Sequence, residues 1–192
     1  QLRLGSTIKW LEQFATILGR LQQEVPQPNR FAGMLEEAAT LALQLRTCIA
    51  DQLPLLRPYA DKAESGSADG ATLQYVFMRG EVPQELRELF DTISVDCAAL
   101  AARLAKVNDI LKASLEDDNG EVERALAEQW FPLFGSAQLR VEAAAYCCLH
   151  LSRADDAGTV PQARWLTFRE FGNEMEITAF TSPVLARSEE RR

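Results

Sequence analysis

Histidine is nearly absent from this sequence: among 192 residues, His150 is the only one. A structural zinc site needs four protein ligands and a catalytic site three, and no second cysteine and histidine pair occurs at ligand spacing. Two-histidine metal centres and paired Glu-x-x-His motifs are therefore excluded. Phosphate-binding glycine loops and the Gly-x-Ser-x-Gly nucleophile motif are also missing. The sequence predicts no metal and no cofactor.

Long apolar runs are absent as well. No segment reaches the roughly 18 uninterrupted apolar residues of a membrane-spanning helix, so no membrane association is expected. Positive charge is also scarce, because 20 lysines and arginines stand against 28 aspartates and glutamates, a net charge of −8. A surface of that sign repels a phosphate backbone, so we expect no nucleic-acid partner. The basic C-terminal end, with Arg187, Arg191 and Arg192 interrupted by Glu189 and Glu190, is interpreted as a solvated tail.

Cysteine is sparse, and its positions do not suggest disulfides. Each of the four, Cys48, Cys97, Cys147 and Cys148, lies in an apolar stretch of helical character, where a free thiol behaves as a small buried hydrophobic group. A chain of this length also buries enough apolar surface to fold without cross-links. We therefore expect four reduced thiols and a reducing compartment, most simply the cytoplasm. Because the sequence starts at Gln1, removal of a leader segment before this residue stays open.

Helical periodicity dominates what is present. Apolar residues recur three and four positions apart over most of the chain, which is the pattern of amphipathic helices. Proline, glycine and capping residues divide this pattern into about five helices, covering residues 6–25, 29 to about 54, 83–111, 118–132 and 137–152. The second helix is expected to end or kink near Pro54, with Pro58 opposing a long continuation, and Pro132 is expected to interrupt the fourth. Asp118 and Ser136 are expected to cap new helices. The polar segment 61–70 predicts a flexible loop.

The third expected helix carries the most regular pattern. Its apolar residues follow one another at spacings of four and three without a miss, which is a heptad seam. They are Leu86, Phe90, Ile93, Cys97, Leu100, Leu104, Val107 and Leu111. A second ridge of Ala98, Ala101 and Ala105 widens the apolar face, so this helix is expected to contact two neighbours. Because fewer than four heptads are present, an intramolecular bundle is favoured over an intermolecular coiled coil.

Near the C-terminus the apolar period changes to two, which is typical of strands. If Gly172 and Asn173 form a two-residue turn, residues 164–180 make a β-hairpin with favourable pairs on both faces. The expected pairs are Leu166 with Ala179, Phe168 with Ile177, Glu170 with Met175, Trp165 with Phe180, Thr167 with Thr178 and Arg169 with Glu176. A two-stranded ribbon is marginal alone, so it must pack on the helices, recruit residues 72–79 as a third strand or join a partner's sheet. The period of residues 72–79 leaves strand and helix open.

The chain is thus expected to be one mainly α domain over residues 1–192, a helical bundle of about five helices with a C-terminal β-hairpin. The apolar side of the hairpin, with Leu166, Phe168, Met175 and Ile177, is expected to cover the helices. The opposite face and the strand edges then remain for docking. The predicted partner-binding residues are Trp165, Thr167, Arg169, Glu176, Thr178 and Phe180.

Three classes of function fit these observations. The sequence favours a non-catalytic protein-interaction module, such as an adaptor, a chaperone-like factor or a subunit of a larger assembly, whose partner is another protein or a second copy of the chain. The alternative is an acidic inhibitor or immunity-type protein that binds a basic toxin or nuclease. A small enzyme using Cys147 and His150, which share a helix face, has less support because nothing marks a third catalytic group.

Overall fold

The structure is a computed structural model of the chain, and it describes residues 1–25, 29–65, 72–117, 120–155, 161–171 and 174–184. Within these ranges it contains four α-helices, one 3₁₀ helix and a five-stranded antiparallel sheet. In chain order the elements are β1 (Leu2–Arg3), α1 (Leu4–Glu24), α2 (Arg30–Ala60), β2 (Glu64–Ser65), β3 (Leu73–Val76), η1 (Met78–Gly80), α3 (Gln84–Glu116), α4 (Arg124–Ser152), β4 (Gln162–Phe171) and β5 (Glu174–Pro183). The mainly α fold with a C-terminal hairpin is confirmed, with four long helices in place of about five.

Two expected helix breaks do not occur, because the prolines lie on solvent-exposed sides of their helices. Pro54 and Pro58 are exposed and four residues apart in α2, and Pro132 is exposed in α4. A helical proline removes a backbone hydrogen bond, and on the exposed side water can donate to the carbonyl left without a partner. Buried side chains on the other side, such as Tyr59 in α2 and Trp130 in α4, continue the core packing past the prolines. An end of α2 near Pro54 and an interruption of α4 at Pro132 are therefore not found.

Helix starts were predicted with mixed success. Asn29 caps α2 as expected, with its side-chain oxygen accepting a hydrogen bond from the backbone amide two residues later at 2.7 Å. The expected start at Ser136 is wrong, because α4 runs through this residue. Helix α4 instead begins at Arg124, with Glu123 in the N-cap position and no side-chain cap. The predicted cap Asp118 lies outside the described residues.

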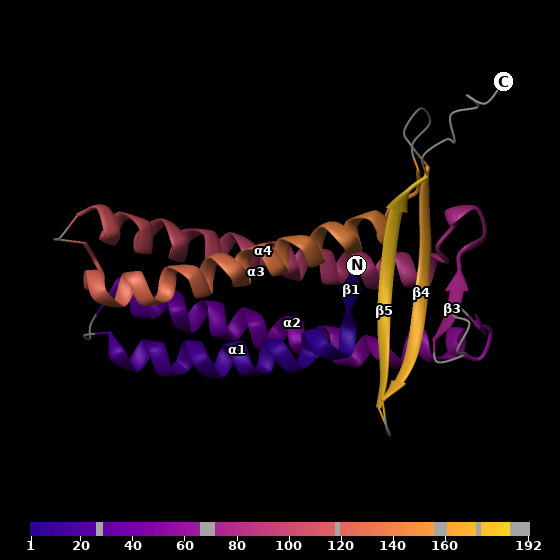
Figure 1. Cartoon of the computed structure of the whole chain (residues 1–192), viewed down its shortest axis with the longest axis horizontal. Helices are drawn as coiled ribbons and strands as arrows, with labels where there is room; N and C mark the ends of the chain where they lie inside the picture. Colours follow the sequence, from indigo (N-terminus) through magenta and orange to yellow (C-terminus); the bar gives the residue numbers. More distant parts are fainter. Residues whose placement is uncertain (26–28, 66–71, 118–119, 156–160, 172–173, 185–192) are drawn as a thin grey trace.

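The helices pack in chain order, α1 on α2, α2 on α3 and α3 on α4, and they run side by side along the long axis of the molecule (Figure 1). Helix α3 contacts two neighbours as predicted, and every residue of its heptad seam is buried. In the second ridge Ala101 is buried but Ala98 is exposed. Buried apolar side chains of the four helices and the sheet join in one continuous core.

The sheet lies at one end of the bundle, and its long strands cross the direction of the helices (Figure 1). The strand order is β1-β5-β4-β3-β2. Strands β4 and β5 pair in the predicted register, with Trp165 opposite Phe180 and Phe168 opposite Ile177. The predicted turn at residues 172–173 lies outside the described residues.

Two segments before α3 complete the sheet. Residues 73–76 form strand β3 against β4, whereas Met78 and Arg79 belong to the 3₁₀ helix η1, so the segment 72–79 that the sequence left open is a strand over its first part only. Glu64 and Ser65 pair with β3, so this part of the expected loop 61–70 is a short strand. The remaining loop residues from 66 onward lie outside the described residues.

The inner face of the hairpin covers the core as predicted at Leu166, Phe168 and Ile177, which are all buried. Met175 departs from the prediction, because its side chain is 38% exposed. It lines a hollow of about 690 Å³ between the hairpin and the C-terminal end of α2, where Pro58 lies opposite. The end of the hairpin therefore extends beyond the helices that cover the rest of its inner face.

Candidate functional site

Glu176 of β5 is bound to the start of α1. Its carboxylate oxygens accept hydrogen bonds from the amides of Gly5 at 2.8 Å and Ser6 at 2.9 Å, and from Ser6 Oγ at 2.5 Å. The N-cap residue Arg3 supplies no side-chain cap, so Glu176 provides the acceptor and the negative charge that a helix N-terminus favours. Predicted as a partner-binding residue, Glu176 is therefore engaged within the chain.

Thr178, another predicted partner-binding residue, is only 7% exposed. Strand β1 pairs with β5 at this point and places Arg3 opposite Thr178, while β3 pairs along the other edge of the hairpin. The expectation of free hairpin edges is therefore wrong over these residues, because short strands of the chain itself occupy them. The predicted residues that stay exposed or half-buried on this face are Trp165, Thr167, Arg169 and Phe180.

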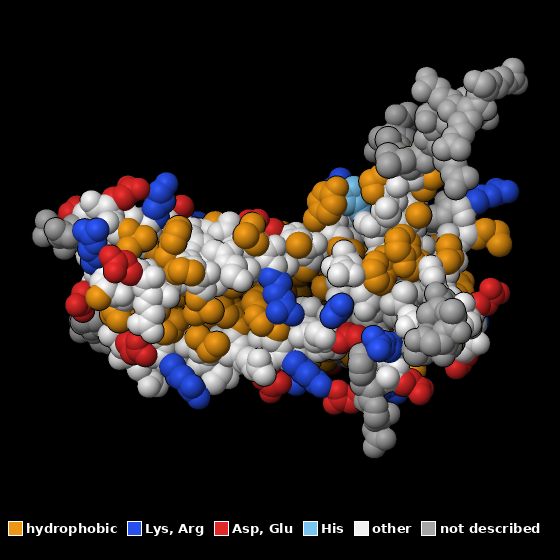
Figure 2. Space-filling view, in the orientation of Figure 1, with side chains coloured by type: hydrophobic (Ala, Val, Ile, Leu, Met, Phe, Trp, Pro, Cys, Tyr) orange, Lys and Arg blue, Asp and Glu red, His pale blue; other side chains and the backbone are white. Residues whose placement is uncertain are grey.

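An apolar row crosses three strands on the outer face of the sheet. Val76 of β3 pairs with Trp165 of β4, which pairs with Phe180 of β5. The rings of Trp165 and Phe180 stack with their centroids 5.0 Å apart and their planes at 4°. Val76 is 57% exposed, and Met78, two residues later, is 82% exposed. We call Val76, Met78, Trp165 and Phe180 the sheet patch; Figure 2 shows hydrophobic side chains gathered at this end of the molecule.

Sequence reasoning found the two aromatic members of the sheet patch and missed the two aliphatic ones. Val76 joins the row only through its pairing with Trp165, and the sequence left its segment undecided between strand and helix. The sequence carries no alternation that could have found them, because Val76, Phe77 and Met78 are all apolar. Only the structure shows that Phe77 is buried between exposed Val76 and Met78.

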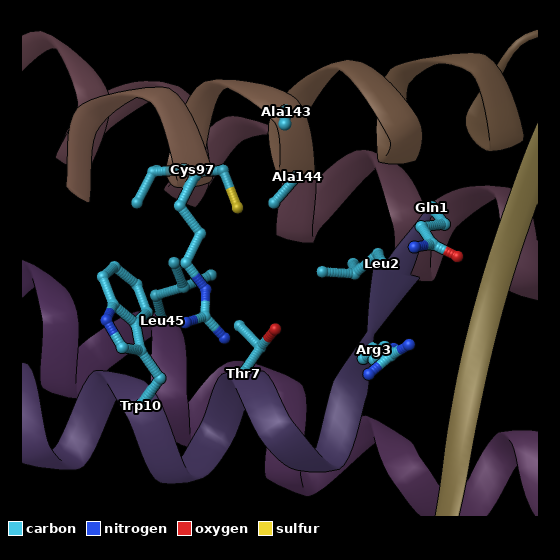
Figure 3. A pocket seen from close by; sticks show the side chains of 11 residues that line it. Gln1, Leu2, Arg3, Thr7, Trp10, Leu45, Cys97, Ala143 and Ala144 are labelled. Atoms are coloured by element: carbon cyan, nitrogen blue, oxygen red, sulfur yellow. The ribbon is translucent and has the colours of Figure 1, made fainter. Parts of the chain in front are cut away.

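A second hollow opens between α1 and α4 beside β1 (Figure 3). Its walls and floor come from all four helices, through Thr7, Trp10, Leu45, Cys97, Ala143 and Ala144. Arg140 lies over the Trp10 ring, with its guanidinium carbon 4.5 Å from the ring centroid. The hollow measures about 210 Å³, below the roughly 300–1,000 Å³ of typical small-molecule sites.

This hollow lacks the groups that catalysis needs. None of the residues that line it is a carboxylate or a histidine. Burial raises the pKa of the Cys97 thiol to about 12, so the nucleophilic thiolate is disfavoured at neutral pH. The hollow therefore supplies neither a general base nor an activated nucleophile.

Cys147 and His150 are held by other partners. Cys147 is buried, its thiol donates to the carbonyl oxygen of Ala179 at 3.6 Å, and burial raises its pKa. The His150 ring packs edge-on against Tyr146, with centroids 4.3 Å apart. All four cysteines are free thiols, as predicted. The helix face that Cys147 and His150 share thus builds no activated thiolate.

Metal-ligand grouping, helix hydropathy and similarity to known proteins do not point to any particular class of function. In the described ranges, no three histidine, cysteine, aspartate or glutamate side chains are grouped to hold a metal ion. None of the helices in this part of the chain has both the length and the apolar character of a membrane span. No family model matches the chain, and no curated protein matches it either. The sheet patch is therefore the feature on which a functional assignment can rest.

Proposed function

We propose that this chain is a non-catalytic protein-interaction module, such as an adaptor, a chaperone-like factor or an assembly subunit, that binds a protein partner through the sheet patch. The observation that carries the proposal is the apolar row formed by exposed Val76 and half-buried Trp165 and Phe180, with exposed Met78 beside it. Aromatic side chains contribute a disproportionate share of protein–protein binding energy, and methionine adapts to irregular apolar surfaces. Burial of such apolar side chains against a partner removes them from water and so favours binding.

The surroundings of the patch have the composition of an interface rim. Thr167 and Arg169 follow Trp165 at alternate positions of β4 and therefore share its face, where Thr167 is half-buried and Arg169 is exposed. An apolar centre with a polar rim is the usual anatomy of protein interfaces.

The second candidate function is an inhibitor or immunity-type protein that binds a basic toxin or nuclease. The observation that favours it is the net charge of −8. Salt separates the two candidates: association steered by exposed charges slows steeply as ionic strength rises, because salt screens those charges. Binding that depends on the apolar sheet patch changes little over the same range.

An enzyme is the least supported of the three classes. The buried Cys147 thiol and the carboxylate-free hollow between α1 and α4 both support a non-catalytic role. The four free thiols support the expected reducing compartment, such as the cytoplasm.

Two exposed valines provide a matched test. Val76 in the patch is 57% exposed and Val95 on α3 is 62% exposed, so Val76→Asp and Val95→Asp add the same charge to similarly accessible positions. The wild-type protein and both variants would be isolated from the organism's own cells, and the mass of each native complex measured. We expect a complex with a defined partner protein that Val76→Asp loses and Val95→Asp keeps.

Loss of a dimer in Val76→Asp alone would assign the patch to a second copy of the chain. Two results would contradict the proposal: a wild-type monomer without a protein partner, or equal complexes in both variants. Melting curves of the two variants confirm that each one folds.

A further inference from the structure

Arg164 of β4 is a buried guanidinium that joins three segments of the chain. Its side chain is 3% exposed. Its Nε donates to the carbonyl oxygen of His150 at 2.6 Å, and its Nη1 donates to that of Gly80 at 2.9 Å. Its Nη2 donates to the carbonyl oxygen of Arg153 at 3.0 Å and to Asp155 Oδ1 at 2.5 Å. The end of α4 and the η1 turn are thereby fixed to the sheet.

These segments, together with the start of α3, line an open cavity of about 560 Å³. Three further arginines line it, Arg79 from η1, Arg87 from α3 and Arg153 from the end of α4. Among the described residues, no carboxylate forms an ion pair with any of the three. The Nε of Arg87 is buried and has no hydrogen-bond partner in this part of the chain. Buried donors are normally satisfied, so an unmatched guanidinium beside a cavity calls for an acceptor.

The backbone of the cavity wall is held in an unusual conformation. Arg79 has a φ of 55° and Gly80 a φ of 73°, both in the left-handed region. A Cβ at Gly80 would lie 2.4 Å from the carbonyl oxygen of Gln162, so only glycine fits there. Holding a non-glycine residue such as Arg79 in this region costs free energy, and such strain is often concentrated at binding sites.

The start of α3 adds unmatched donors to the same cavity. Its first residue Gln84 and its N-cap Pro83 both line the cavity, and no side chain caps this end of the helix. A helix N-terminus carries partial positive charge and unbonded amides, which favour an anion. The arginines and the N-terminal end of α3 therefore both favour an anionic ligand.

The charges around the cavity match a dianion. Arg164 and Asp155 neutralise each other, which leaves Arg79, Arg87 and Arg153 against the carboxylate of Glu81. Two positive charges therefore stay uncompensated among the lining residues. A phosphate monoester carries about −1.5 to −2 at neutral pH and presents three acceptor oxygens, whereas a single carboxylate carries one charge.

We propose that this cavity, the arginine pocket, binds a phosphoryl group carried on an organic molecule. The volume of about 560 Å³ exceeds what a phosphate ion fills and falls within the usual range for small-molecule sites. The phosphoryl group belongs either to a small metabolite or to a phosphorylated side chain of a protein. This inference does not depend on binding at the sheet patch.

Titration calorimetry with the full chain tests the proposal with three probes: inorganic phosphate, phenyl phosphate and a pentapeptide containing phosphotyrosine. We expect saturable binding of phenyl phosphate or of the peptide below about 1 mM. Arg87→Gln should weaken it about tenfold or more, because one charged donor is lost. Arg20→Gln, which removes the same charge from an exposed position on α1, should leave binding unchanged.

Affinity should also fall below about pH 6, where the phosphoryl group loses its second charge. If the peptide binds at least tenfold more tightly than phenyl phosphate does, the phosphoryl group belongs to a protein. If phenyl phosphate binds at least tenfold more tightly than the peptide, the phosphoryl group belongs to a metabolite. Equal affinities still support a phosphoryl site. Absence of binding by all three probes, or equal weakening by Arg87→Gln and Arg20→Gln, overturns the proposal, and thermal melting shows whether both variants are folded.

Discussion

The helical bundle and the sheet of this protein share one apolar core, but the sheet is also held to the helices by specific polar contacts. The bundle is held by many similar apolar contacts, such as those of Leu100 and Leu104, whose spacing in the sequence repeats every three or four residues. The sheet is fixed at its two sides by two charged residues, Glu176 at the start of α1 and Arg164 at the end of α4. Glu176 reaches Gly5 across 171 residues of sequence. Loss of one apolar contact in the bundle leaves many similar ones, whereas the hydrogen bonds to the start of α1 and to the end of α4 described above each depend on one side chain, Glu176 or Arg164.

The largest expected effect comes from the bundle. Leu104→Ala empties a fully buried position in the heptad seam and should lower the free energy of unfolding by about 2–5 kcal/mol. Urea denaturation measures this change, with Lys106→Ala, at an exposed position two residues later, as the control. A loss near zero for Leu104→Ala would show that the seam faces solvent or a missing partner.

Arg164→Met should cost about 1–3 kcal/mol, because buried carbonyl groups and Asp155 lose their donor. The effect should be local: amide hydrogen exchange should accelerate in β4 and η1 and stay unchanged in the centre of α3. Arg103→Met is the matched control, since it breaks a partly exposed ion pair with Glu37 and should change stability by less than about 1 kcal/mol. Uniformly faster exchange across the bundle would refute the separate roles of the two regions.

Glu176→Gln should destabilise the protein by about 1 kcal/mol, because the start of α1 loses the charge of its cap. Glu174→Gln offers a control that removes an equal charge two residues away, where the ion pair with Lys9 is exposed on both sides. We expect the melting temperature to fall in Glu176→Gln and to stay unchanged in Glu174→Gln. Equal melting temperatures for both variants would mean that the contact with α1 contributes nothing.

The smallest expected effect is a pH dependence at Asp155. Its hydrogen bond with Arg164 holds the pKa of Asp155 below its ordinary value. A carboxyl group whose pKa is lower in the folded state stabilises the fold above its unfolded pKa of about 4, and this contribution disappears as the pH falls through the folded value. Denaturation at pH 7 and pH 3 should therefore show a stability gap between wild type and Asp155→Asn that narrows at the lower pH. A constant gap would contradict the ion pair.

In both regions the sequence predicts the contacts that follow a regular spacing and misses those that do not. The heptad seam and the hairpin register follow from spacing and were predicted residue by residue, because burial of one face imposes a period. The prolines misled the prediction because proline generally interrupts a helix, whereas Pro54, Pro58 and Pro132 lie on exposed sides of their helices, where water can replace the lost hydrogen bond. Arg164 and Glu176 could not be assigned from sequence, since their partners are mostly backbone groups, which every residue possesses.

The sequence likewise predicts part of the sheet patch but not the arginine pocket. Trp165 and Phe180 were predicted from their cross-strand pairing, and the stack confirms that they lie side by side. The arginine pocket was missed because Arg79, Arg87 and Arg153 belong to three separate elements without any shared spacing. Only the packing of α3, α4 and η1 around Arg164 brings them to one cavity.

The central claim, that the outer face of the sheet binds a partner protein, is tested most directly by site-specific photo-crosslinking. A photoreactive residue would replace Thr167, which lies beside Trp165 on the half-buried outer face, and in a second experiment Val95 on α3. Illumination in the organism's own cells should yield one crosslinked protein of defined mass from position 167 and none from position 95. A crosslink from position 95 alone, or none from position 167 when the chain is folded, would contradict the account.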